Sequence, residues 1–474
     1  MEYEPVIGLE VHVQLQTESK MFCGCSTKFG AKPNTQTCPV CLGFPGVLPS
    51  ANKKAIEYSL KVALALNCQI SNYMKFDRKH YFYPDLPKNF QISQYDKPLA
   101  VDGFLDIVVD KTAKRIKIKR AHLEEDAGKL IHARDKSQVD FNRAGMPLLE
   151  IVTEPDINSP QEAYDYLSAL KNVLLYLGVS DCNMEEGSLR CDANISIRPN
   201  GSPKLGTKTE LKNMNTFKGV RLALEYEIDR QTGALGDGKE ITQETRLWDA
   251  DKGVTVTMRT KEEAHDYRYF PEPDLAPFTV EQAFIDGLRA ALPELPHQRK
   301  DRLVKQFELS EYDASAITQD KKLADYFENC TKLYPNAKAI ANWLMGDIMA
   351  ELNKRVLGGI DELGFAEGSL IDMLKLIDAG TINGKMAKDV LRESIETRKG
   401  PLEIVKSRGL SQITDKKHIV EIIDEVLKAN AKIVDDYKNG KTNAFMFLVG
   451  QVMKQTKGKA NPQMVNELLS EKLK

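Results

Sequence analysis

Residues 6–16, with the sequence VIGLEVHVQLQ, alternate apolar and polar side chains from Leu9 onward. Alternation with a period of two is typical of a strand that has one buried face. The apolar positions are Ile7, Leu9, Val11, Val13 and Leu15, and the polar positions are Glu10, His12, Gln14 and Gln16. The pattern therefore predicts a strand at a half-buried sheet, with Glu10 and His12 next to each other on its polar face.

Around this strand, the chain up to residue 292 is rich in short alternating segments, Gly and Pro turns and isolated helical patterns. From Pro293 onward almost every segment has the apolar periodicity of a helix, with a break at Gly400-Pro401. The 474 residues also exceed the roughly 100–200 of one ordinary domain. We therefore expect an α+β fold in three parts: a strand-rich domain at 1–292, an all-α helical domain at 293–410 and a small helical tail domain at 411–474.

The composition is that of an ordinary globular protein, with 42% hydrophobic and 28% charged residues. The formal net charge is −2, so no overall positive field attracts nucleic acid, and any basic surface must be local. The N-terminal residues show no targeting signal, and no run approaches the roughly 20 apolar residues that span a bilayer. We expect a cytoplasmic protein with no membrane partner.

Four cysteines are clustered in the pattern Cys23-x-Cys25-x12-Cys38-x2-Cys41. Two close pairs of thiolates supply the tetrahedral ligand set of zinc, and four sulfur ligands leave no open position for catalysis. The pattern predicts a structural zinc site in a loop at 23–41. The alternative is a surface loop with reduced thiols. Because zinc ribbons also bind nucleic acid, this motif does not define a function.

Acidic residues form a second group of candidates. Glu10 and His12 share a strand face, Glu124-Glu125-Asp126 follows an alternating strand, and Glu150 lies in the apolar run 147–152. A carboxylate is costly to bury unless a cation meets it, and carboxylates with one imidazole suit Mg²⁺ or Mn²⁺. The spacing does not choose between Glu124 and Glu125. Alternatively, Glu10 and Glu150 are simply the polar side of half-exposed strands.

Basic residues that could contact phosphate are scattered along the chain, and each alone is more often a solvated strand residue. The candidates in the strand-rich part are Lys79, Lys88, Arg143 and Arg268, and those near the C-terminus are Lys454, Lys457 and Lys459. The C-terminal lysines could neutralise RNA phosphates or could form a solubilising loop. The stretch 233–239 fits the first part of the P-loop motif, G-x4-G-K. The P-loop requires Ser or Thr at the next position, where this chain has Glu240, so an ATP site in this chain would not be a P-loop.

Several stretches together resemble one known family. They are VIGLEVHVQL at 6–15, the four cysteines, KHYFYPDLP at 79–87, HLEEDAGK at 122–129, DFNRAG at 140–145 and DYRYFPEPD at 266–274. The chain resembles the B subunits of the aspartyl/glutamyl-tRNA(Asn/Gln) amidotransferases, and the resemblance runs from near the start to the C-terminal unit.

The resemblance implies a cradle-shaped catalytic domain, a helical domain and a tail that binds tRNA. It implies a ligase that forms carbon–nitrogen bonds with glutamine as the amide donor. Such a protein uses ATP to phosphorylate the side-chain carboxylate of glutamyl-tRNA(Gln) or aspartyl-tRNA(Asn), and ammonia then displaces phosphate. Ammonia comes from the amidase, which is the A subunit, and the small C subunit braces the heterotrimer. The implied cofactors are ATP and Mg²⁺, beside the structural Zn²⁺.

The resemblance also assigns residues. It implies a catalytic magnesium site at Glu10, His12, Glu125 and Glu150, and contacts to phosphate or to the ammonia passage at Lys79 and Lys88. Arg143 and Arg268 are phosphate candidates by charge alone, and Lys454, Lys457 and Lys459 are the candidates for tRNA. Two alternatives remain: a zinc-stabilised RNA-binding or assembly protein without its own catalytic centre, and a ligase that acts on a free amino acid. The sequence does not say which of the two misacylated tRNAs is used.

Overall fold

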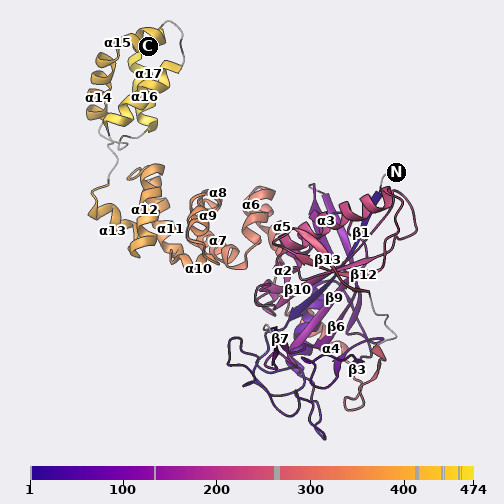
Figure 1. The fold of residues 1–474 in the computed structure, drawn as a ribbon. Helices are drawn as coiled ribbons and strands as arrows, with labels where there is room; N and C mark the ends of the chain where they lie inside the picture. Colours follow the sequence, from indigo (N-terminus) through magenta and orange to yellow (C-terminus); the bar gives the residue numbers. More distant parts are fainter. Residues whose placement is uncertain are drawn as a thin grey trace. The chain divides into compact units, whose positions relative to one another are not determined.

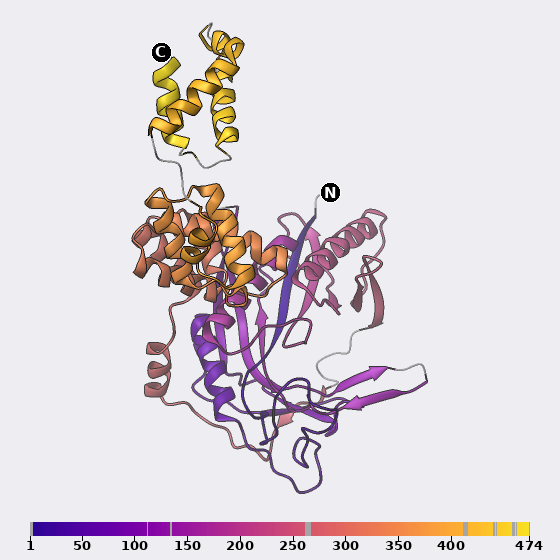
Figure 2. The same cartoon turned by 90° about the vertical axis from the view of Figure 1, so that its left-hand side faces the viewer.

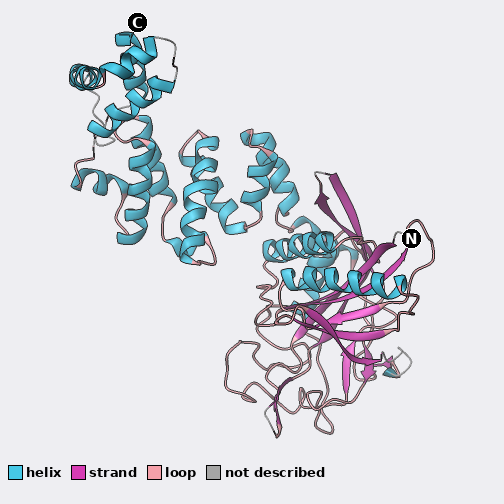
Figure 3. Cartoon of the chain, turned by 45° about the horizontal axis from the view of Figure 1, so that its top comes forward, coloured by secondary structure: helices cyan, strands magenta, loops and turns pink. Residues whose placement is uncertain are grey.

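The computed structural model describes residues 3–110, 112–132, 135–260, 267–410, 416–438, 441, 443–456, 460 and 462–473. The chain divides into two compact units, Met1–Leu295 and Pro296–Lys474. The first unit is strand-rich, and the second is built from helices wherever the structure describes it (Figure 1, Figure 3). The predicted α+β class is confirmed.

The first unit is organised around a nine-stranded sheet with the order β13-β12-β11-β10-β1-β9-β6-β5-β2. Its strands are β1 (Tyr3–Gln14), β2 (Gln69–Ile70), β5 (Ala100–Val109), β6 (Thr112–Glu125), β9 (Pro147–Thr153), β10 (Leu189–Pro199), β11 (Thr209–Lys212), β12 (Glu244–Asp249) and β13 (Val254–Thr260). A small sheet contains β14 (Phe270–Pro271), β3 (Asp77–His80) and β4 (Phe90–Ser93), and a hairpin contains β7 (Lys129–His132) and β8 (Ser137–Asp140). The hairpin extends away from the main sheet (Figure 2).

Strand β1 has the predicted alternation, because Ile7, Leu9, Val11 and Val13 are buried, as is Leu15 directly after the end of the strand. They pack in one hydrophobic cluster with residues from the first helices of the chain. Those helices are α1 (Lys53–Ala65), α2 (Pro160–Leu177) and α3 (Phe217–Gly236), followed by α4 (Gln282–Ala290). The side chain of Asn52 accepts hydrogen bonds from the backbone of Lys54 and Ala55 and so caps α1. The polar residues of β1 therefore lie on the sheet face opposite this core.

The second unit contains two hydrophobic clusters, one formed by residues between 303 and 405 and one by residues between 419 and 473. Its helices are α5 (Pro296–Phe307), α6 (Glu311–Thr318), α7 (Lys321–Leu333), α8 (Ala337–Trp343), the π-helical turn η2 (Leu344–Ile348), α9 (Met349–Arg355), α10 (Ile360–Leu363), α11 (Glu367–Asp378), α12 (Gly384–Thr397), α13 (Pro401–Ser407), α14 (Lys416–Ala429), α15 (Ala431–Lys438), α16 (Asn443–Gln455) and α17 (Pro462–Leu473). Among the described residues, none of the helices combines the length and the apolar character that a membrane span needs.

Candidate active site

The register of the central strands aligns four polar residues in one row across the sheet. His12 of β1 lies opposite Arg190 of β10 on one side and opposite Glu150 of β9 on the other. Glu150 in turn lies opposite His122 of β6. Directly opposite residues point to the same face of a sheet. The four side chains therefore line the polar face, and Glu124, two residues beyond His122 on β6, joins them.

Three of these residues form what we call the first cluster: His12, Glu124 and Glu150. The Nε2 atom of His12 lies 3.3 Å from Oε2 of Glu150 and 3.5 Å from Oε1 of Glu124. One candidate ligand atom from each residue lies within 4.8 Å of the others. His122 lies behind them, with its Nε2 3.4 Å from Oε2 of Glu150. Two carboxylates and one imidazole at this spacing suit a hard divalent cation.

The charges of the first cluster are strongly coupled. Burial opposes the charged form of His12, but the hydrogen bond to Glu150 and the charges of Glu150 and Glu124 outweigh it and raise the pKa of His12 to about 9. Burial and the charge of Glu150 raise the pKa of Glu124 to about 7. Burial also lowers the pKa of His122 to about 4, so this imidazole is neutral near pH 7. Carboxylates held this close relieve their repulsion by binding a proton or a cation.

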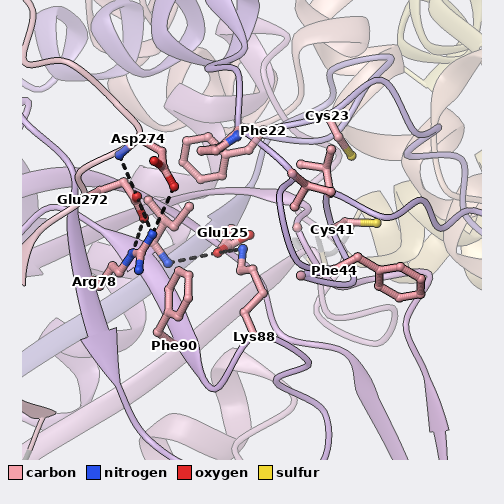
Figure 4. A pocket seen from close by; sticks show the side chains of 16 residues that line it. Phe22, Cys23, Cys41, Phe44, Arg78, Lys88, Phe90, Glu125, Glu272 and Asp274 are labelled. Carbon is pink, nitrogen blue, oxygen red and sulfur yellow. Dashed lines mark hydrogen bonds and ion pairs between the residues drawn. The ribbon is translucent and has the colours of Figure 1, made fainter.

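Glu125, which we predicted as a ligand of the magnesium ion, lies outside this cluster. Its side chain forms an ion pair with Lys88, and its Oε1 accepts a hydrogen bond from the backbone N–H of Ile92 at 2.9 Å. It lines a cavity of about 180 Å³ on the other side of β6 (Figure 4). Successive strand residues point to opposite faces, so Glu124 takes the place in the cluster that we predicted for Glu125. Lys88 lies with Glu125 in this cavity and not at the first cluster.

Glu10 belongs to what we call the second cluster, which consists of Glu10, Asp192 and Glu210. Asp192 lies opposite Glu10 in the register of β10 and β1, and Asn194 donates a hydrogen bond of 2.8 Å to Oε1 of Glu10. The ammonium of Lys212 pairs with Asp192 and lies 3.5 Å from Oε1 of Glu210. The four residues predicted to bind one magnesium ion are therefore divided among the two clusters and the cavity.

Lys79 lies close to the first cluster. Its Nζ is 4.8 Å from the ring centroid of Tyr267 and 5.8 Å from that of Tyr81. Burial opposes its charge, but Tyr269, Glu124 and Glu150 together raise the pKa of Lys79. The ammonium makes no hydrogen bond or ion pair with the residues that the structure describes. Of the four predicted phosphate contacts, Lys79 is thus the one placed beside the first cluster.

Arg143 and Arg268, the two arginines predicted to contact phosphate, do not lie beside the first cluster. Arg143 donates hydrogen bonds to the carbonyl oxygens of Ala127 at 3.0 Å and Gly128 at 2.6 Å, so its guanidinium fastens the turn after β6. Arg268 is exposed, and its carbonyl oxygen lies 3.2 Å from Nδ1 of His80. Neither arginine contacts the first or the second cluster.

Sequence reasoning missed Arg190, His122 and Glu210, whose places depend on strand register.

The four cysteines form a separate cluster that could bind a metal ion such as zinc. One sulfur atom from each of the four lies within 4.8 Å of the others. The buried ammonium of Lys20 lies 3.7 Å from Sγ of Cys41 and donates to the carbonyl oxygen of Gln36 at 2.7 Å. A hydrogen bond from Cys23 and the charge of Lys20 lower the pKa of Cys41 to about 4 despite burial. A thiolate is the form that binds a metal.

In the tail, Lys454 is exposed in the last turn of α16. Lys457 and Lys459 lie outside the described residues.

Comparison with known proteins identifies the class of protein to which this chain belongs. Residues 5–286 match the family model described as the GatB/GatE catalytic domain, and residues 325–473 match the model described as the GatB domain. The strand-rich unit with its acidic clusters is thus the catalytic part of a tRNA-dependent amidotransferase, a ligase-type enzyme.

Curated relatives define the family more closely. The chain is 57% identical over the full length of both chains to the B subunit of the aspartyl/glutamyl-tRNA(Asn/Gln) amidotransferase of Thermoanaerobacter sp. (strain X514). It is 56% identical to the protein of the same name from Carboxydothermus hydrogenoformans, over 100% of this chain and 99% of the relative. The chain belongs to the family of B subunits of the aspartyl/glutamyl-tRNA(Asn/Gln) amidotransferases.

Proposed function

We propose that this chain uses ATP to phosphorylate the side-chain carboxylate of glutamyl-tRNA(Gln), aspartyl-tRNA(Asn) or both, and that ammonia then displaces the phosphate to form the amide. A carboxylate reacts poorly with ammonia because its oxygen is a poor leaving group, and phosphorylation removes this obstacle. The observation that carries the proposal is the first cluster with the ammonium of Lys79 beside it, for which the described part of the chain supplies no ion-pair partner. The relatives are named as subunits of an aspartyl/glutamyl-tRNA amidotransferase.

The charges on the polar face support a role for magnesium. Among the described residues, six carboxylates gather there, from Glu10, Glu124, Asp126, Glu150, Asp192 and Glu210, and their cationic neighbours include Lys79, Arg143, Arg190 and Lys212. His12, Glu124 and Glu150 would hold one Mg²⁺, and Glu10, Asp192 and Glu210 fit a second. The ion would screen the repulsion between ATP and the substrate carboxylate. Lys79 would contact a phosphate, and its tyrosine neighbours limit the access of water to its ammonium.

The remaining parts of the chain have proposed roles as well. The division into a catalytic domain at 1–292, a helical domain at 293–410 and a tail at 411–474 is kept as a proposal, with tRNA bound by the tail. Zinc at the four cysteines is proposed to be structural. The relatives are named as one subunit of an enzyme, which implies partner subunits. We propose that these are an amidase, the A subunit, which releases ammonia from glutamine, and a small C subunit.

The proposed function is tested by measuring ATP hydrolysis in the assembled complex. Hydrolysis should require both Mg²⁺ and misacylated tRNA. A zinc-stabilised RNA-binding or assembly protein would show none, and a ligase for free amino acids would amidate glutamate without tRNA.

Metal binding to the first cluster should become tighter as the pH rises. Below its pKa of about 9, His12 is protonated in the metal-free chain and cannot act as a ligand. Raising the pH removes the competing proton, so the affinity for Mn²⁺ should increase by up to about tenfold per pH unit between pH 7 and 8. It should level off above pH 9. Mn²⁺ titrations followed by electron paramagnetic resonance measure this, and a pH-independent affinity would exclude His12 as a ligand.

The tail lysines should affect the binding of tRNA and not the chemistry. We expect that Lys454→Ala, Lys457→Ala and Lys459→Ala together raise KM for charged tRNA several-fold at constant kcat, and that they reduce the salt dependence of binding by about one unit of slope per lost phosphate contact. Lys472→Ala is the matched control, because Lys472 pairs with Asp424 at 2.8 Å. An unchanged KM in the triple variant would remove these lysines from the tRNA surface.

A further inference from the structure

Arg190 has a buried hydrogen-bond donor that no described residue satisfies. It lies opposite His12 in the sheet register and so stands beside the first cluster. One terminal nitrogen donates a hydrogen bond of 2.8 Å to Oδ2 of Asp126. Its Nε is buried and has no hydrogen-bond partner among the described residues. A buried donor without an acceptor is costly, so an open guanidinium nitrogen in a polar site is expected where an anionic ligand supplies the acceptor.

The surroundings of Arg190 place its charge between the two acidic clusters. Arg190 lies opposite His12 of the first cluster in the sheet register, and Asp192 of the second cluster is two residues further along the same face of β10. Arg190 therefore lies beside both candidate cation sites. An anion bound there would be shared by the cations and by Arg190.

Two of the other cations near the clusters, Arg143 and Lys212, are less open to a ligand than Arg190. Arg143 is engaged with backbone carbonyls, and Lys212 is paired with two carboxylates of the second cluster. In Arg190, Asp126 accepts a hydrogen bond from one terminal nitrogen of the guanidinium group. The remaining N–H groups could donate to a phosphate, whose oxygens the planar guanidinium geometry suits.

We propose that Arg190 binds the phosphoryl group that passes from ATP to the substrate carboxylate. This inference rests on the proposed function. In that step the bond between the terminal phosphorus and its bridging oxygen breaks, and ADP leaves with the electron pair. A bond forms between the same phosphorus and a carboxylate oxygen. Arg190 keeps its proton and donates hydrogen bonds to the phosphoryl oxygens, whose charge it helps to balance.

The test compares nucleotides with and without the terminal phosphate. In the assembled complex with Mg²⁺, Arg190→Gln should weaken binding of a non-hydrolysable ATP analogue on the order of tenfold. The affinity for ADP should change less than about twofold, because ADP lacks the group that Arg190 contacts. Isothermal titration calorimetry measures both affinities. Arg198→Gln is the matched control: Arg198 lies on the same face of β10 but pairs with Glu4 at 2.6 Å, and neither affinity should change.

Arg190→Lys serves as a second variant, because it keeps a positive charge beside Asp126 and so preserves the fold. It should bind ADP and Mn²⁺ as the unchanged complex does, and the ATP analogue more weakly. Equal losses for ADP and the analogue would mean that Arg190 only maintains the structure of the site, and unchanged binding of the analogue would also overturn the inference. If the unchanged complex binds the analogue but shows no tRNA-dependent ATP hydrolysis, the proposed function fails while the contact to the phosphate stands.

Discussion

Replacing Glu124 by Gln is expected to lower kcat of ATP-dependent amidation by on the order of a thousandfold in the assembled complex. The substitution keeps the size of the side chain but removes one of the two carboxylates that lie within 3.5 Å of His12. A neutral amide is a weak ligand for Mg²⁺ and does not balance its charge. The affinity for Mn²⁺, measured by electron paramagnetic resonance, should fall together with the rate.

Glu125→Gln is the matched control, since it changes the neighbouring residue in the same way. Glu125 pairs with Lys88 on the opposite side of β6, so this variant should keep its affinity for Mn²⁺. Its amidation rate reports on the cavity that Glu125 lines and not on the metal. The reverse outcome, in which Glu125→Gln loses Mn²⁺ and Glu124→Gln keeps it, would restore the ligand set that the sequence resemblance implied.

The positions of Glu10 and His12 on one face of β1 could be predicted from the sequence. Which of Glu124 and Glu125 points to the polar face of β6 could not. Alternation in β1 correctly placed Glu10 and His12 on one polar face, because burial of a single strand face depends on neighbouring residues. In β6, the pairing with β9 shifts between Ile118 and Arg120. An irregularity of this kind breaks the alternation of faces, so the pattern at 115–119 does not extend to Glu124 and Glu125.

The pairing register of the strands was the second feature that could not be predicted from the sequence. Glu10 meets Asp192, and His12 meets Arg190, only because β1 pairs with a strand about 180 residues later in the chain. No local pattern encodes that pairing. For the same reason the four residues predicted to bind one magnesium ion lie in two clusters and a cavity, whereas the four cysteines, which are close in sequence, lie together as predicted.

Zinc bound to the four cysteines should stabilise the loop at 23–47, which packs little against the hydrophobic core. Removing the metal with a chelator, or replacing Cys41 by Ser, is expected to increase protease cleavage between residues 23 and 47 by about tenfold or more, since structural zinc supplies folding free energy directly. Within this loop Phe29 and Phe44 are exposed, while Cys41 is buried next to Lys20. Without zinc, the thiolates lose the cation that balances most of their negative charge. Limited proteolysis with mass spectrometry locates the cleavage, and a colorimetric assay counts the zinc released.

Cys330→Ser separates this effect from a general loss of stability. Cys330 is a buried core residue of the second unit, so its replacement should lower the thermal midpoint of unfolding without releasing zinc or exposing residues 23–47. The loop also contributes Cys23 and Cys41 to the cavity that contains Glu125 and Lys88. Opening the loop should therefore change that cavity while the first cluster, on the other face of β6, keeps its affinity for Mn²⁺. A chain that contains no zinc yet resists cleavage as well as the untreated protein would show that the four thiols are not a structural metal site.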